Sequence, residues 1–141
     1  MKNRFLKDVC SCVVCIVALF HFNNCTYQKK SSINPEIECS QLIPDTVSFK
    51  NDVLPLLGNN CSLAGCHSGP LPSGGLNLEP ARAYIQLSRK GSGYIDTINP
   101  TRSVLYSSLV SKTNPMPPTG NLSDCDIELI ATWMQQKAKN N

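Results

Sequence analysis

The sequence predicts an all-α fold for one small domain, and three observations lead to this class. Apolar residues recur at helical spacing in four segments between about residues 46 and 141, and no segment shows the alternation of a strand. Prolines, glycines and a serine stand where these helices are expected to begin and end. A hydrophobic content of 41% in 141 residues is typical of a globular chain and too high for a disordered one.

The first two helices are expected at about residues 49–59 and from Pro80 to Gly91. Pro55 lies in the first turns of the former or kinks it, whereas Pro80 suits the first position of the latter and Gly91 its end. The expected core residues of these two helices are Phe49, Val53, Leu56, Leu57, Ala81, Tyr84 and Ile85.

The third helix is expected after the Asn99–Pro100 turn, and the fourth begins at Ser123, its expected N-cap. Their expected core residues are Val104, Leu105, Leu109, Ile127, Ile130, Ala131 and Met134. The stretch 68–79 between the first two helices has little to bury. A domain this small therefore needs a further source of stability, such as disulfides, a metal or a bulky cofactor.

Residues 1–24 are expected to form an export signal. A basic head precedes an uncharged apolar run at 9–22, which is shorter than the about 20 residues that span a membrane. Cys25 and the polar stretch after it resemble a bacterial lipoprotein signal, in which that cysteine carries the lipid. This resemblance implies an exported, membrane-anchored protein that faces the periplasm, on either the inner or the outer membrane. The alternatives are an ordinary secreted protein and an uncleaved anchor, and all three place the domain in an oxidising compartment.

Residues 25–45 are expected to be a tether and lead-in, because they show no sustained period and contain two prolines, and residues 46–141 form the domain. A net charge of +3 without a long basic block argues against a nucleic-acid partner. The sequence has no Ser-His-Asp set, no paired catalytic carboxylates and no Gly-rich phosphate loop. We therefore do not expect an enzyme.

Cys61, Cys66 and His67 form the motif C-x-x-x-x-C-H. The signature of covalent haem attachment is C-x-x-C-H, in which the thiols bond to the haem vinyl groups and the histidine binds the iron. Here two further residues must loop outward, and Gly65 allows such a bend. One alternative is a local disulfide beside a surface histidine. The other is a zinc site completed by Cys39 or Cys125, although Cys66 and His67 are neighbours in the chain and so are difficult to place around one tetrahedral ion.

Met116 lies among prolines in the segment NPMPP, residues 114–118. Prolines stiffen a loop, as a ligand on a loop requires, and methionine opposite an imidazole stabilises ferrous iron. His67 is the only histidine left once the signal with His21 is removed, so an iron there takes Met116 or another donor, or stays open. The alternative is that Met116 only caps the core.

These segments, with the closing LSDCDIELIATWMQQKAKNN, resemble a small exported cytochrome c-like domain of the type found on bacterial lipoproteins and in planctomycete-type cytochrome proteins. Over residues 46–141 the resemblance implies the class I cytochrome c fold with one covalent haem c. It implies haem attachment at Cys61 and Cys66, a proximal ligand at His67 and a distal ligand at Met116. The same fold brings Cys39 near Cys125, which favours a disulfide. The cations expected at the surface, any one of which can instead pair with a haem propionate, are Arg82, Arg89, Lys90 and Arg102.

The function expected from the sequence is that of a lipid-anchored periplasmic cytochrome, which passes single electrons between redox partner proteins. The alternative is a haem-free, disulfide-stapled lipoprotein that binds or interacts with another molecule.

Overall fold

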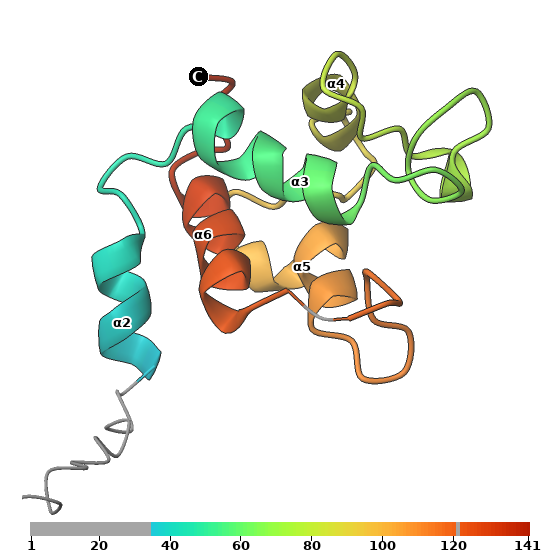
Figure 1. The fold of residues 1–141 in the computed structure, drawn as a ribbon. Helices are drawn as coiled ribbons and strands as arrows, with labels where there is room; N and C mark the ends of the chain where they lie inside the picture. Colours follow the sequence, from blue (N-terminus) through green and yellow to red (C-terminus); the bar gives the residue numbers. More distant parts are fainter. Residues whose placement is uncertain (1–34, 121) are drawn as a thin grey trace, which may run out of the picture. The chain divides into compact units, whose positions relative to one another are not determined.

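All of the secondary structure in residues 35–120 and 122–141, the residues that the computed structural model describes, is helical (Figure 1). The expected all-α class is therefore confirmed for this part of the chain, whereas the export signal and Cys25 lie outside it. No helix found here is long and apolar enough to cross a membrane. The elements are α2 (Pro35–Leu42), the π-helical turn η2 (Phe49–Val53), α3 (Leu54–Asn60), the 3-10 turn η3 (Ser73–Gly75), α4 (Ala83–Leu87), the 3-10 turn η4 (Pro100–Arg102), α5 (Val104–Leu109) and α6 (Asp124–Gln135).

Helix α6 begins where the sequence predicts. The Ser123 side chain accepts a hydrogen bond from the Asp126 N–H at 3.1 Å, and Asp124 and Asp126 lie in the first turn, where the helix dipole favours anions. The helix packs against α2, η2, η4 and α5. Its buried residues are Ile130, Ala131, Trp133 and Met134.

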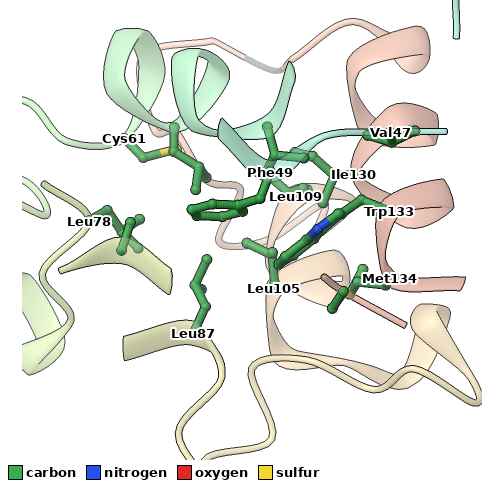
Figure 2. Close-up of a cluster of buried hydrophobic side chains, with 14 of the residues drawn as sticks. Val47, Phe49, Cys61, Leu78, Leu87, Leu105, Leu109, Ile130, Trp133 and Met134 are labelled. Atoms are coloured by element: carbon green, nitrogen blue, oxygen red, sulfur yellow. The ribbon is translucent and has the colours of Figure 1, made fainter. Parts of the chain in front are cut away.

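The core is built around two aromatic rings, Phe49 from η2 and Trp133 from α6 (Figure 2). Their ring centroids lie 5.1 Å apart, and the ring of Tyr84 meets Phe49 edge-on at 5.2 Å. Leucines from α3, α4 and α5 pack around these rings, and so does Cys61. The core therefore extends to the end of α3, where the cysteine motif begins.

The C-terminal residues return to the start of η2 (Figure 1). Asn141 accepts hydrogen bonds from the Phe49 N–H at its side-chain oxygen and from the Lys50 N–H at its main-chain oxygen, both at 2.9 Å. The Trp133 ring N–H donates to the Lys139 carbonyl at 2.9 Å. This tail satisfies N–H groups at the start of η2 that have no partner within the helix.

Helix α2 lies inside the segment 25–45, which was expected to be a tether without regular structure. Pro35 occupies its first position, where proline is favoured, but the segment has no apolar stripe that periodicity can detect. A disulfide joins Cys39 of α2 to Cys125 of α6, with the two Cα atoms 5.0 Å apart. The covalent link fixes this helix beside α6.

Two further expectations about the helices are wrong in detail. Helix α4 covers only Ala83–Leu87 instead of starting at Pro80, so Ala81 lies before it and is exposed. Ala83 and Leu87 are buried and Tyr84 packs against the core, whereas Ile85 is 70% exposed. Val104 is 44% exposed because it lies at the first position of α5, beside the cavity described below. Short helices present too few residues for their spacing to reveal the buried face.

Candidate functional site

A cavity of about 270 Å³ brings Cys61, Cys66, His67 and Met116 together. Its buried end is apolar, formed with Cys61 by Leu76, Leu78, Leu105 and Leu109. Its rim is exposed and includes Gly65, Gly74, Val104, Met116 and Pro118. The remaining lining residues are Asn60, Cys66, His67, Ser73, Tyr94, Ser108 and Pro117. Residues from three separate segments thus converge on one apolar space.

Helix α3 positions Cys61 at the buried end of the cavity. Cys61 caps this helix, with its N–H donating to the Leu57 carbonyl at 2.9 Å, and its side chain lies in the core cluster near Phe49 (Figure 2). Burial, and to a smaller extent the nearby Cys66 thiol, raises the pKa of Cys61 from 9.0 to about 11. The Cys61 side chain is therefore a neutral thiol at physiological pH.

The residues between the two cysteines loop outward, as their number requires. Leu63, Ala64 and Gly65 are exposed, and Gly65 has a left-handed φ of 80°. The loop closes through a hydrogen bond from the Cys66 N–H to the Leu63 carbonyl at 2.9 Å and one from the His67 N–H to the Cys61 carbonyl at 3.1 Å. These hydrogen bonds therefore keep Cys66 and His67 close to the segment that carries Cys61, even though four residues separate the two cysteines.

The ring of His67 is held in one orientation by a main-chain carbonyl. Its Nδ1 lies 3.2 Å from the Leu76 oxygen, and because a carbonyl only accepts, Nδ1 is the donor in this contact. In the neutral ring Nε2 then carries the lone pair. The His67 carbonyl also accepts from the Leu78 N–H at 2.8 Å. Metal-binding histidines are typically held in this way, with the second ring nitrogen donating to a carbonyl or carboxylate.

Met116 is attached to the cavity rim by the main chain. Its N–H donates to the Ser108 carbonyl of α5 at 3.0 Å, and prolines stand on both sides of it. The side chain lines the cavity and is 38% exposed, whereas Met134 is fully buried. Met116 therefore contributes little to core packing and lies exposed at the cavity rim.

The segment 68–79 has a role that the sequence did not indicate. It was expected to bury little, but Leu76, Asn77 and Leu78 are buried, and with Ser73 and Gly74 the two leucines form one wall of the cavity. The only signal was the pair of leucines two apart after Gly74 and Gly75, which is too short to establish a period. No lining residue is Arg or Lys, and Arg82, Arg89, Lys90 and Arg102 are all exposed.

No family model, curated protein or solved structure matches the chain. The chemistry of the site therefore has to follow from its own donor atoms, which are the sulfurs of Cys61, Cys66 and Met116 and the ring nitrogens of His67. Cys61 and Cys66 are free thiols rather than a local disulfide, and the Cys39–Cys125 disulfide uses both residues considered as a fourth zinc ligand. Residues 35–120 and 122–141 contain no group of three or more His, Cys, Asp and Glu that could hold a metal ion.

This donor set fits a covalently bound haem. Two free thiols, a histidine with a free Nε2 and a thioether line a cavity whose buried end is apolar. The volume of about 270 Å³ is slightly below the roughly 300–1,000 Å³ of ordinary ligand pockets. A group as large as a porphyrin therefore fits only with part of it beyond the exposed rim.

We expect Gly65→Ala to lower the free energy of unfolding by about 1–2 kcal/mol, because an L side chain is strained at a φ of 80° even where its Cβ meets no atom. The matched control is Gly58→Ala within α3, where the Cβ also meets no atom within 4 Å. This control should instead gain about 0.5–1 kcal/mol, because alanine is the better helix former. Urea denaturation measures both changes, and equal effects would contradict the left-handed bend at Gly65.

We expect Cys61 to react about 100-fold more slowly with iodoacetamide in the folded, haem-free chain than in urea at pH 8, with the modification at Cys61 followed by fragment mass spectrometry. Its pKa of about 11 leaves a much smaller thiolate population than the ordinary value of 9.0. The folded thiol holds its proton more tightly, so its stabilising contribution is complete below pH 9 and is lost as the pH rises towards 11. Equal rates in the two states would contradict the burial of this thiol.

Proposed function

We propose that the chain is a periplasmic, lipid-anchored c-type cytochrome domain, which binds one covalent haem c and transfers single electrons. The observation that carries this proposal is the convergence of Cys61, Cys66, His67 and Met116 on one apolar cavity. These side chains supply the two thiols and the histidine of the motif, together with the methionine that the resemblance to cytochrome c implies.

Each of these residues has a separate task. Cys61 and Cys66 would hold the cofactor through thioether bonds, and the His67 imidazole and the Met116 thioether would bind its iron. The Leu76 carbonyl keeps the His67 lone pair on Nε2 by accepting the Nδ1 proton. Bound haem supplies a one-electron Fe(III)/Fe(II) couple at this position.

The surrounding residues influence the reduction potential of the proposed cofactor and leave one edge of the cavity accessible to redox partners. Leu78, Leu105 and Leu109 exclude water from the buried end, and the Met116 thioether favours the ferrous state and so raises the reduction potential. The exposed rim near Met116 and Pro118 gives redox partners access for brief docking through a small interface. Lipid on Cys25 keeps the domain at the membrane where such partners lie.

The decisive experiment exports the full chain in a bacterium that matures c-type cytochromes, then measures the intact mass and the visible spectrum of the reduced protein. We expect one covalent haem and the sharp bands of a low-spin thioether haem. A Cys61→Ser/Cys66→Ser variant should lose the haem mass, whereas a Cys39→Ser/Cys125→Ser control keeps it. A Cys25→Ser variant should lose the lipid mass and keep the haem mass.

Colourless mature protein without the haem mass would overturn the proposal. The haem-free binding lipoprotein held by the Cys39–Cys125 disulfide would then be the remaining function.

A further inference from the structure

The segment 73–78, which begins with η3, folds back along the cysteine arm, defined here as residues Gly65–Gly69. Ser73 makes two bonds to this arm: its N–H donates to the Cys66 carbonyl at 2.8 Å and its hydroxyl donates to the Gly65 carbonyl at 3.2 Å. Further along, the Leu76 carbonyl and the Leu78 N–H bond to His67. Ser73 therefore binds Gly65 and Cys66 of the cysteine arm, and Leu76 and Leu78 bind His67.

The wide cysteine spacing makes the first of these contacts important. The two additional residues make the chain between Cys61 and Cys66 loop outward, with Leu63, Ala64 and Gly65 exposed. The Leu63 carbonyl in this loop accepts from the Cys66 N–H at 2.9 Å and from the Ser68 hydroxyl at 2.8 Å. Gly65, where the loop turns back, has a left-handed φ and no atom within 4 Å of a Cβ position, so packing contacts do not hold it there. The Ser73 hydroxyl is the side-chain donor that reaches this residue.

We propose that Ser73 is a positioning residue for cofactor attachment, which sets where the Cys66 thiol faces the cavity. It acts through the Gly65 and Cys66 carbonyls and also lines the cavity itself. This role rests on the proposed function for its purpose, but the position of the Cys66 thiol can be measured without any haem.

The first test uses the haem-free full chain and compares the alkylation rates of Cys66 and Cys61. Ser73→Ala should raise the Cys66 rate about three- to tenfold, because one side-chain hydrogen bond that holds the arm is lost, and should leave the Cys61 rate unchanged. Ser73→Thr keeps the hydroxyl and should restore the original Cys66 rate. The matched control is Ser88→Ala, which removes a hydroxyl bond of 2.7 Å to the Tyr84 carbonyl in α4 and should change neither rate.

The second test uses the matured, haem-loaded protein. Ser73→Ala should lower several-fold the fraction of chains attached through both sulfurs, measured by mass on proteolytic fragments, and should change the spectrum of the axial ligands, with Ser73→Thr again restoring both. Unchanged Cys66 reactivity in Ser73→Ala would overturn the proposal, and so would a parallel rise at Cys61, which indicates general loosening. If the wild-type chain holds no haem, the proposed function fails, and the alkylation rates still decide whether Ser73 positions Cys66.

Discussion

Removal of the Cys39–Cys125 disulfide is expected to lower the free energy of unfolding by about 3–5 kcal/mol. The bridge joins residues separated by 86 positions, so it encloses most of the domain and restricts the unfolded chain strongly. The change is Cys39→Ser combined with Cys125→Ser, which leaves no unpaired thiol at either position. Urea denaturation followed by circular dichroism measures the loss.

A reductant provides the matched control for this prediction. It should destabilise the wild-type chain by a similar amount and leave the double variant unaffected. A loss below about 1 kcal/mol would contradict the view that the disulfide replaces part of a thin core, because native disulfides of small exported domains typically contribute 2–5 kcal/mol.

For the proposed cytochrome, Met116→Ala is expected to leave the iron of a bound haem accessible to added ligands. The alanine has no donor atom, so carbon monoxide or added imidazole should bind, and the absorption spectrum should change. The reduction potential should fall, by roughly 60 mV for each tenfold loss of preference for the ferrous state. Spectroscopic titration and redox potentiometry of the matured protein measure both effects.

Met134→Leu is the matched control, because Met134 is fully buried in α6 and lies outside the cavity lining. This volume-conserving change should cost less than about 1.5 kcal/mol of stability and leave the potential unchanged. If Met116→Ala neither binds ligands nor alters the spectrum, Met116 is not an axial ligand.

The sequence predicts those features that depend on neighbouring residues. The helical class, the N-cap at Ser123 and the buried stripe of α6 follow from spacing and capping within a few residues. The outward loop at Gly65 follows from the count of residues between Cys61 and Cys66. Each of these patterns is complete within one short stretch of chain.

Features that depend on distant contacts were not predictable in this way. Helix α2 has no apolar stripe, and its position depends on a disulfide to α6. The carbonyl that orients His67 belongs to Leu76, in a stretch whose composition indicates only a loop. The exposure of Ile85 follows from the shortness of α4, which tertiary packing sets and propensity does not.

The hydrogen-bond partners of His67 have a consequence for the order in which the domain assembles. All of them, Cys61, Leu76 and Leu78, lie within eleven positions of it along the chain, whereas Met116 is 49 positions away. Closing the longer loop costs about 1.5 kcal/mol more in chain entropy than closing the loop to Leu76. The histidine half of the site is therefore expected to form early in folding, and the methionine half late, when α5 and its following loop have docked.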